Sequence, residues 1–340
     1  MRAQPDTSRP RRVTIKAVAS DAGVSVAAVS KVLNNGYGVS ADMRDRVLRS
    51  VEKLGYRPSF AARGMRGATD TIGVLLVDMR NPFLAGLTEG IKSDLASEGK
   101  VMMMSVGEAE MSIESSLIDA MIDMRMDGVI LVAPCLTTDI LSDYASQIPT
   151  VVIGHHDPEA EGFDTVNSDD CAGAQLAVEH LIARGHEDIW MLTAPLRPGG
   201  KEVFHMRERG YRLAMEQAGL ADRMHVIRSD TSLGDNPDEL VALLDDIPRP
   251  GAVFCWSDIH AIPLLTMARE RGLRVPRDLA IVGYDNTPTA ALPPIGLTSV
   301  EQHADQLGRQ AAATMLRRVA EGSHGKHVLI QPNLVPRASS

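Results

Sequence analysis

Residues 14–35 read TIKAVASDAGVSVAAVSKVLNN, and this stretch decides how the first part of the chain folds. Thr14 and Ser25 are favourable N-cap residues, and each precedes a run with apolar residues at helical spacing. Gly23 between the two runs is a typical helix end. Ser40 precedes a third, longer run of the same kind. The pattern therefore predicts three short helices with a tight turn between the first two, which is a helix-turn-helix unit.

The charge of the chain is unevenly distributed. Residues 1–67 hold 13 Lys and Arg against 5 Asp and Glu, a net charge of +8, whereas the other 273 residues hold 22 against 39, a net charge of −17, within a total of −9. A small basic head on a large acidic body suggests that only the head binds a polyanion. A solvated basic face without a partner is the alternative.

From about residue 70 the pattern changes to short apolar runs that alternate with amphipathic stretches. This alternation predicts parallel β-sheets with helices on both faces, and the number of units exceeds one sheet, so we expect two lobes. The predicted strands are Ile72–Val77, Val101–Val106, Gly128–Val132, Thr150–Ile153, Ile189–Thr193, Val253–Cys255 and Leu279–Gly283, and the predicted helices are Phe83–Ser97, Ile113–Met124, Ala172–Arg184, Arg207–Ala218, Asp238–Leu244 and Asp258–Arg271.

Composition excludes several classes of protein. With 44% hydrophobic and 23% charged residues the chain is an ordinary globular one, and no apolar run approaches the ~20 residues that span a bilayer. The first twelve residues lack the apolar core of a secretory signal. Three cysteines without CxxC spacing argue against a disulfide framework and a zinc site. We expect a cytoplasmic protein without a membrane partner.

Catalytic and metal-binding motifs are absent from the sequence. There is no GxSxG, no P-loop, no HExxH and no GxGxxG after a strand, so we expect no enzyme and no cofactor. His155 and His156 invite a metal interpretation, but adjacent side chains cannot share one face and no second cluster has ligand spacing. We expect no metal site.

The second helix of the head carries the candidate base contacts. Val26 and Ala27 are small enough to touch a thymine methyl group, and Lys31 can donate to guanine. Thr14, Ser25 and Ser30 suit hydrogen bonds to phosphates, which position the head without reading sequence. The alternative is that Ser25 only caps the helix and Lys31 is only solvated.

This head and the stretch VSADMRDRVLRSVEKLGYRPSFAARGMRG (residues 39–67) closely resemble the head and hinge of the lactose/galactose repressor family of bacterial transcription regulators. The resemblance implies that Val26, Ala27 and Lys31 choose the operator bases. Many members of the family carry Arg where Lys31 stands, and Lys lacks the bidentate fork of Arg. The resemblance implies a set of DNA contacts, namely Thr14, Ser25, Val26, Ala27, Ser30, Lys31, Asn34, Arg63, Met65 and Arg66.

The segment 58–67 corresponds to the family's hinge. A helix this short is marginal in water, so it should form only when another surface supports it. In the family, two hinge helices pack together in the minor groove and an apolar side chain wedges between base pairs. Met65 stands at the wedge position, and Arg63 and Arg66 would face phosphates or the narrow groove. The alternative is a flexible, protease-sensitive linker.

The acidic body has polar and aromatic residues in the loops after its predicted strands, where open parallel sheets bind ligands. The candidate effector contacts are Asn81, Phe83, Arg207, Trp256, Asp258 and Asp285. Aromatic rings stack on sugar rings, while carboxylates and a guanidinium bind vicinal hydroxyls. Each also has a structural interpretation: Asp258 and Asp285 as caps, and Phe83 as a core residue.

The body resembles the type I periplasmic-binding-protein fold that the same family carries, in the stretches VEHLIARGHEDI, RERGYRLAME, AVFCWSDIHAI, GLRVPRDLAIVGYDN and LVPRAS. The resemblance places Arg207, Asp258 and Asp285 in one lobe's side of the effector cleft and Asn81 and Phe83 in the other's. The stretch 197–206, RPGGKEVFHM, is longer than is usual in the family, and its Lys201, Phe204 and His205 could enter the cleft. Trp256 is also bulkier than the residue that many members carry there.

These observations predict an α-helical head with a hinge helix, followed by an α/β body of two doubly wound parallel-sheet lobes. The expected parts are a flexible N-terminus 1–12, the head 13–57, the hinge 58–67 and the body 70–340, with lobe one at about 70–167 and 299–331 and lobe two at about 168–298 and 332–340.

We expect a ligand-responsive, DNA-binding transcriptional regulator that represses carbohydrate-utilisation genes and binds a palindromic operator as a homodimer. No leucine-heptad segment follows LVPRAS, so a dimer rather than a tetramer is expected. The alternatives are a regulator that responds to a non-sugar effector such as a nucleobase, an exported sugar-binding receptor, and a sugar-processing enzyme.

Overall fold

The computed structural model describes residues 13–33, 36–56, 68–195, 200–229, 237–322 and 325–340. The chain forms two units, Met1–Thr69 and Asp70–Ser340, called the head and the body below. The expected flexible N-terminus (residues 1–12) and hinge (58–67) lie outside the described residues. Within the described residues, no helix is long and apolar enough to cross a membrane.

The head consists of α1 (Ile15–Ala22), α2 (Val26–Leu33) and α3 (Ala41–Leu54). Each helix begins where a hydroxyl caps it: Thr14 accepts from the Ala17 amide at 3.3 Å, Ser25 from Ala28 at 3.1 Å, and Ser40 from Met43 at 3.3 Å. Gly23 and Gly55 end α1 and α3 in the left-handed region, at φ 65° and 61°. The three helices close on a small core of Val18, Val29, Val47 and Tyr56. The predicted helices are confirmed.

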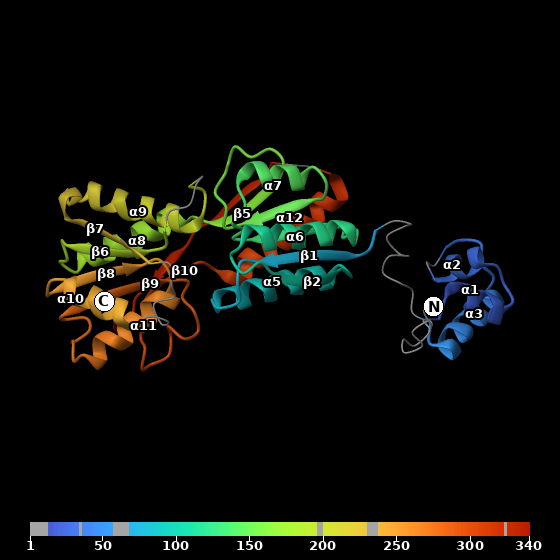
Figure 1. Ribbon diagram of the computed structural model, residues 1–340, viewed down its shortest axis with the longest axis horizontal. Helices are drawn as coiled ribbons and strands as arrows, with labels where there is room; N and C mark the ends of the chain where they lie inside the picture. Colours follow the sequence, from blue (N-terminus) through green and yellow to red (C-terminus); the bar gives the residue numbers. More distant parts are fainter. Residues whose placement is uncertain (1–12, 34–35, 57–67, 196–199, 230–236, 323–324) are drawn as a thin grey trace, which may run out of the picture. The chain divides into compact units, whose positions relative to one another are not determined.

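The body has two lobes, each built on a six-stranded sheet (Figure 1). The first lobe's sheet has the order β11-β5-β4-β3-β1-β2 and is parallel throughout, and the second has the order β12-β10-β9-β8-β6-β7 with only β12 antiparallel. The strands are β1 (Thr71–Leu76), β2 (Val101–Val106), β3 (Gly128–Val132), β4 (Thr150–Ile153), β5 (Asp164–Ser168), β6 (Ile189–Thr193), β7 (Met224–Arg228), β8 (Gly251–Cys255), β9 (Leu279–Tyr284), β10 (Thr298–Glu301), β11 (His327–Ile330) and β12 (Asn333–Val335). The predicted pair of parallel-sheet lobes is confirmed.

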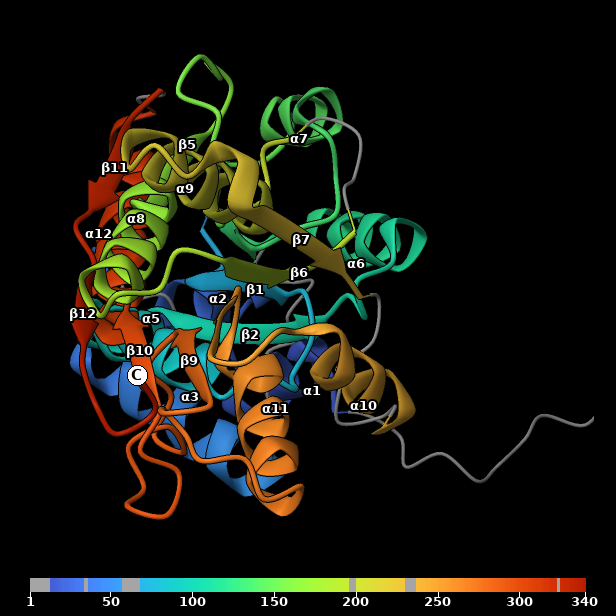
Figure 2. The same ribbon diagram turned by 90° about the vertical axis from the view of Figure 1, so that its left-hand side faces the viewer.

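Helices cover both faces of each sheet. In the first lobe the buried residues of α5 and α12 form one core and those of α6 and α7 the other. In the second lobe α10 and α11 cover one face, and α8 and α9 cover the other (Figure 2). The helices are α5 (Phe83–Ser97), α6 (Met111–Asp123), α7 (Thr138–Ala145), α8 (Asp170–Ala183), α9 (Val203–Gln217), α10 (Pro237–Asp246), α11 (Asp258–Glu270) and α12 (Ala304–Glu321), with one 3-10 turn at Ala221–Arg223.

Two glycines let α5 and α12 approach closely. A Cβ atom at Gly308 would lie 2.1 Å from the Leu87 carbonyl oxygen, and one at Gly90 would lie 2.3 Å from that of Asp305. Any side chain at either position would push the helices apart, so this pair of helices depends on glycine at the contact.

The chain passes between the lobes three times: between β5 and α8, between β10 and α12, and between β11 and β12. Strand β10 pairs with β9 and β12, so residues 299–301 belong to the second lobe. The chain therefore returns to the first lobe after Glu301, three residues later than the predicted boundary at 298/299.

Candidate ligand cavity and nucleic-acid interface

A cavity of about 240 Å³ lies between the two lobes at the carboxyl ends of their strands. It is lined by loops that follow β1, β3 and β4 of the first lobe and β6, β8 and β9 of the second. Five of the six predicted effector residues line it: Asn81, Phe83, Arg207, Trp256 and Asp285. Ligand sites in open parallel sheets form at this edge because the strand ends leave room between the connecting loops.

Aromatic side chains from both lobes form part of the cavity wall. Phe83 comes from the first lobe, where it lines the cavity and also packs against the core. Phe204 and Trp256 come from the second lobe and meet edge to face, with ring centroids 6.0 Å apart at 77°. His260 lies beside Trp256 at 5.2 Å between centroids. Rings on opposite walls can hold a flat or ring-shaped ligand between them.

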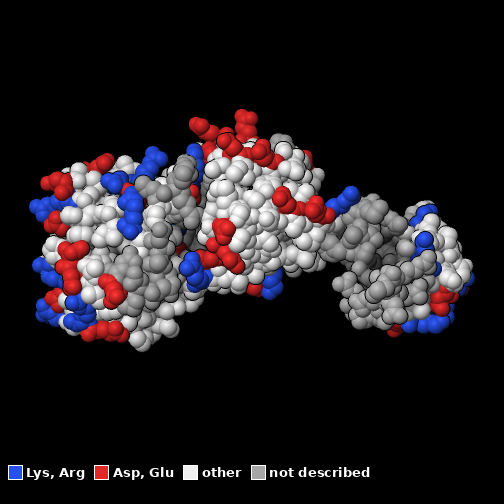
Figure 3. Space-filling view, in the orientation of Figure 1, with Lys and Arg blue, Asp and Glu red and all other residues white. Residues whose placement is uncertain are grey.

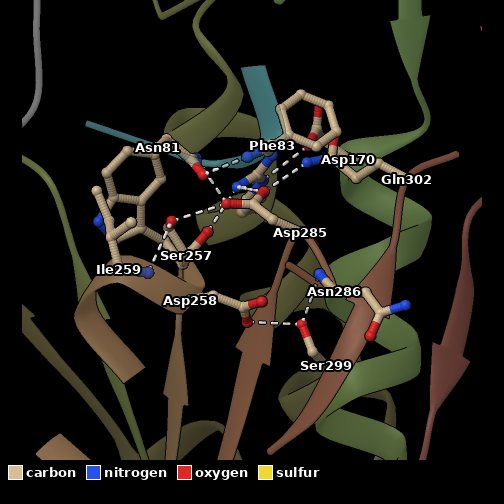
Figure 4. A network of polar contacts seen from close by, with 12 residues as sticks. Asn81, Phe83, Asp170, Ser257, Asp258, Ile259, Asp285, Asn286, Ser299 and Gln302 are labelled. Carbon is tan, nitrogen blue, oxygen red and sulfur yellow. Dashed lines mark hydrogen bonds and ion pairs between the residues drawn. The ribbon is translucent and has the colours of Figure 1, made fainter. Parts of the chain in front are cut away.

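Asp285 is the centre of the polar wall (Figure 4). Its Oδ2 accepts hydrogen bonds from the Asn81 amide and the Ser257 hydroxyl, both at 2.8 Å, and its Oδ1 accepts from Gln302 at 2.6 Å. Burial raises the pKa of Asp285, and the nearby Arg207 opposes that shift. The residue has φ 105°, a conformation that an L side chain rarely adopts, so the fold holds its carboxylate in place against local strain.

Arg207 is buried, and its guanidinium contacts carboxylate, carbonyl and aromatic groups. Its Nε donates to Asp170 Oδ1 at 2.7 Å, and its Nη1 donates to the Trp256 carbonyl at 2.5 Å and lies 3.6 Å from Asp285 Oδ1. The guanidinium carbon sits 3.7 Å from the centroid of the Tyr284 ring. Burial disfavours the charged form, but Asp170 and Asp285 outweigh it and raise the pKa of Arg207. The guanidinium is thus locked and charged.

A series of polar contacts joins the two lobes at two places. His156 of the first lobe contacts Asp170 of the second at 2.8 Å, and Asp170 leads through Arg207 to Asp285, which binds Asn81 of the first lobe. Burial favours the neutral form of Asp170, yet Arg207 and His156 lower its pKa. Any molecule that fills the cavity meets groups that hold the lobes together.

The backbone joins the lobes as well. His155 and Glu202 form an isolated antiparallel bridge, and the His156 amide donates to the Lys201 carbonyl at 2.7 Å. Lys201 also pairs with Asp157 at 3.4 Å. Lys201 and Glu202 of the long stretch 197–206 therefore contact the first lobe, and residues 197–199 lie outside the described residues.

Asp258 lies outside the cavity lining, contrary to the prediction. Its Oδ2 accepts from the amide and hydroxyl of Thr287 at 2.7 and 3.0 Å. Its Oδ1 accepts from the Ser299 hydroxyl at 2.7 Å (Figure 4). Burial and the Asp285 carboxylate raise the pKa of Asp258 to about 7, against those hydrogen bonds. The side chain positions the turn that follows Asp285 and contacts no cavity space.

Sequence reasoning missed several polar residues of the cavity. Asp170 and Gln302 follow β5 and β10, two strands that were not predicted, and Ser257 follows Trp256 as the N-cap of α11. Glu202 and Phe204 line the cavity from the long stretch, whereas His205 turns away and pairs with Glu202 at 2.9 Å. Of the three residues of this stretch that were expected to be able to enter the cleft, Phe204 lines the cavity, and Lys201 and His205 do not.

Metal-binding geometry is not found among the described residues, where no group of three His, Cys, Asp or Glu side chains converges. His155 instead contacts the Thr138 hydroxyl at 3.0 Å, and burial lowers its pKa to about 4. His156 contacts Asp170, as described above.

In the head, α2 exposes Ala27 and Lys31 to solvent, as a reading surface requires. Val26 is half-buried and packs against the core of the head, so only part of its side chain faces outward. Ser30 is also half-buried. The hydroxyl oxygens of Thr14 and Ser25 accept the capping hydrogen bonds of their helices, and the O–H of each can donate to a phosphate oxygen. The expected contacts Asn34, Arg63, Met65 and Arg66 lie outside the described residues.

Comparison with known proteins connects the two units. A family model described as "Bacterial regulatory proteins, lacI family" matches residues 14–59, and one described as "Periplasmic binding protein-like domain" matches residues 178–340. The HTH-type transcriptional repressor PurR of Vibrio campbellii is 32% identical over 334 residues, which cover 95% of this chain and 97% of that protein. This chain belongs to the lacI family.

Other members agree along the whole length. PurR of Photobacterium profundum is 31% identical over 336 residues, covering 96% of this chain and 98% of that protein. The transcriptional regulator CelR in complex with cellobiose is 27% identical with a TM-score of 0.70, and covers 97% of this chain and all of that one. The lac repressor dimer bound to operator and the anti-inducer ONPF has a TM-score of 0.80 at 24% identity, over 97% and 99% of the chains, and shares the fold.

Membership in the lacI family confirms the predicted resemblance and fold. The relatives are transcriptional repressors rather than enzymes. This lacI-family protein is a DNA-binding transcriptional regulator, as predicted.

Proposed function

We propose that this protein is a repressor that binds a palindromic operator as a homodimer and that a small molecule in the cavity between its lobes controls that binding. The observation that carries the proposal is that two partly buried polar contacts, His156–Asp170 and Asn81–Asp285, join the lobes at the cavity residues Asp170 and Asp285. A ligand that engages Asp285 changes which of these contacts survive, and so changes the balance of lobe arrangements.

The head supplies the DNA contacts. Helix α2 has Lys31 and Ala27 exposed on a unit whose sequence is strongly basic. Lys31 reads a base edge in the major groove, and Thr14, Ser25 and Ser30 hold phosphates. Arg63, Met65 and Arg66, which lie outside the described residues, contact the minor groove. A coupling of about 1–3 kcal/mol between effector and operator is typical and suffices to control a hinge that is marginal on its own.

A dimer contact is supported by apolar side chains at one edge of the first lobe. Strand β2 ends the sheet, and its Val101, Met103 and Met104 are 55%, 39% and 45% exposed. Met111 and Met124, at the two ends of α6, are 43% exposed each. Figure 3 shows a broad uncharged area over the part of the first lobe where β2 and α6 lie in Figure 1. An unpaired strand edge with exposed methionines is a typical protein interface.

A sugar or sugar derivative fits the cavity's chemistry. Carboxylate, amide and guanidinium groups line the cavity together with aromatic rings, and this combination can bind the hydroxyls and the C–H faces of a sugar. Solved relatives include CelR with cellobiose and a regulator from Enterococcus faecium with bound ribose, at 27% and 26% identity. Genes of carbohydrate utilisation are the corresponding targets.

A nucleobase effector is the second candidate. Phe83 on one lobe and Phe204 and Trp256 on the other provide rings on both sides of the cavity, which can enclose a planar heterocycle. The same experiment separates the two classes.

The test selects genomic fragments with the full-length protein at low salt, and then measures operator affinity by fluorescence anisotropy with monosaccharides, disaccharides and nucleobases. We expect salt-sensitive binding to a near-palindromic site and a 5- to 150-fold change in affinity with one class of compound, the range of about 1–3 kcal/mol. A protein that selects no fragment, or that binds DNA without any salt dependence, would refute the proposal.

A further inference from the structure

The charges that line the cavity are predominantly negative. Among the described residues the lining has four carboxylates and two guanidinium groups and no lysine. They are Asp78, Asp170, Glu202, Asp285, Arg80 and Arg207.

Each of the two cations already has a carboxylate partner. Arg80 is bound to Asp78, with Nη2 at 3.1 Å and Nε at 3.4 Å from Oδ2, and its side chain is 62% exposed. Arg207 is bound to Asp170 at 2.7 Å, is held by the Trp256 carbonyl and is stacked on a ring. If either guanidinium turned to a bound anion, its present carboxylate partner would lose its counter-charge, so neither can neutralise a further anion.

Asp285 and Glu202 remain as the carboxylates in excess. Three of the groups that bind Asp285 are neutral: Asn81, Ser257 and Gln302. The fourth, Arg207, is 3.6 Å away and is shared with Asp170. Glu202 lies 2.9 Å from the ring nitrogen of His205, and no ion pair between Glu202 and a lysine or arginine is found among the described residues.

Some buried polar atoms in the lining have no hydrogen-bond partner among the described residues. The Ser168 hydroxyl and the Trp256 Nε1 are buried in the wall without one. The indole can only donate, and the hydroxyl can donate or accept. Groups of this kind suit a hydroxyl or carbonyl oxygen of an uncharged ligand.

Resting on the proposed function, we infer that the effector is an uncharged or cationic molecule and that the cavity rejects phosphorylated and carboxylate-bearing ligands. A buried anion there has no free cation among the described residues and faces Asp285 and Glu202, so its lost hydration is not repaid. A neutral polyol or nucleobase loses only hydrogen bonds to water, which the wall can replace.

The sign of the cavity's potential can be measured without knowing the effector. The chain has two tryptophans, and the Trp190→Phe variant leaves Trp256, on the cavity wall, as the only one. Its fluorescence is quenched with Cs⁺ and with iodide at pH 7.5 and constant ionic strength, each normalised to a free tryptophan amide. Because potentials near a charged cleft reach several kT, we expect Cs⁺ to quench about threefold or more efficiently than iodide.

Two variants test whether the difference between Cs⁺ and iodide quenching arises from the charges of the cavity. Glu202→Gln should lower the ratio of Cs⁺ to iodide quenching. Glu216→Gln, the same change at an exposed position of α9, the helix that begins after Glu202, should leave the ratio unchanged. Iodide quenching equal to or stronger than Cs⁺ quenching would overturn the inference.

The second experiment compares matched ligands on the full chain. One series is glucose, glucosamine, gluconate and glucose 6-phosphate, and the other is adenine, adenosine and AMP. Thermal shift measures ligand binding, and fluorescence anisotropy measures the effect on operator affinity. We expect any compound that raises the melting temperature to be neutral or cationic, with its phosphorylated or carboxylate counterpart at least about tenfold weaker. An anion that binds more tightly than its neutral counterpart overturns the inference. If the protein binds its operator and no compound changes that binding, the effector part of the proposed function is wrong. The quenching ratio still tests the sign of the charge in the cavity.

Discussion

The side-chain amide of Asn81 donates to the carboxylate of Asp285 at 2.8 Å, across the cavity and between residues 204 positions apart in the chain. Asn81 belongs to the first lobe and Asp285 to the second, so this bond ties the lobes together at the ligand site. The amide satisfies a buried carboxylate when no ligand is present. A ligand that binds Asp285 must share this oxygen with Asn81 or displace it, which links ligand binding to lobe arrangement.

Replacing Asn81 by Ala should lower the free energy of unfolding of the protein by about 1–3 kcal/mol, because one donor to a buried charged acceptor is lost. Urea denaturation followed by circular dichroism measures the change. Arg80→Ala, one residue away and largely exposed, should change the free energy by no more than about 0.5 kcal/mol. Equal effects of the two substitutions would show that the Asn81–Asp285 bond contributes nothing special.

Asp258 makes stability depend on pH. Burial and the Asp285 carboxylate raise its pKa in the folded protein to about 7, whereas the unfolded side chain titrates at about 3.9. Between these values the folded protein holds a proton that the unfolded chain has lost, so the contribution of Asp258 to stability is full below about pH 4 and is lost as the pH rises to about 7.

Asp258→Asn keeps the shape of the side chain and removes the proton. The free energy of unfolding of the unmodified protein should therefore fall relative to that of the variant between pH 4.5 and pH 7.5, by an amount on the order of 3–4 kcal/mol. Denaturant titrations at four pH values give the difference. Parallel pH profiles for the two proteins would mean that Asp258 is ionised in the folded state throughout.

The sequence predicts those elements whose signal is local. Helix caps at Thr14, Ser25 and Ser40 depend on one residue and its neighbours, and each caps its helix in the structure. The central strands of both lobes are nearly continuous apolar runs, which only a doubly covered parallel sheet explains.

Strands β5 and β10 were not predicted because their sequences, DTVNS and TSVE, are largely polar, although most of these residues are buried. Their polar groups are satisfied by other segments: Asn167 binds the backbone at Gly154 and His155, and Ser299 binds Asp258. Such partners come from distant parts of the chain, so no window of sequence reveals them.

The same limit applies to the cavity. The loops that bear the site were predictable from the strand ends, but Asp258 was misplaced because neighbouring side chains of one loop face different ways. Asp170, which holds Arg207, was missed because its strand was missed. Sequence thus indicated which loops meet and only partly which side chains meet.

Lys31 is predicted to read a base in the operator. Lys31→Ala should weaken operator binding by about 1–3 kcal/mol, or 5- to 150-fold, and should relax the preference at one base pair of each half-site. Anisotropy titrations against the selected operator and its single-base variants measure both effects, and effector affinity should stay the same. Lys92→Ala removes the same charge from an exposed position of the body and should leave operator binding intact. An unchanged base preference in the Lys31 variant would reassign Lys31 to phosphate contact.

The edge of β2 is predicted to join two copies of the chain. Met103→Lys places a charge among the exposed apolar side chains of this edge, and a desolvated charge without a partner costs several kcal/mol at an interface. Sedimentation velocity at micromolar concentrations should show a dimer for the unmodified chain and at least about tenfold weaker dimerisation for the variant, with a matching loss of affinity for the palindromic operator but not for an isolated half-site. Leu292→Lys makes the same change at a residue that is 51% exposed on the second lobe and should leave the dimer intact. Dimerisation that survives Met103→Lys and fails with Leu292→Lys would move the interface to the second lobe.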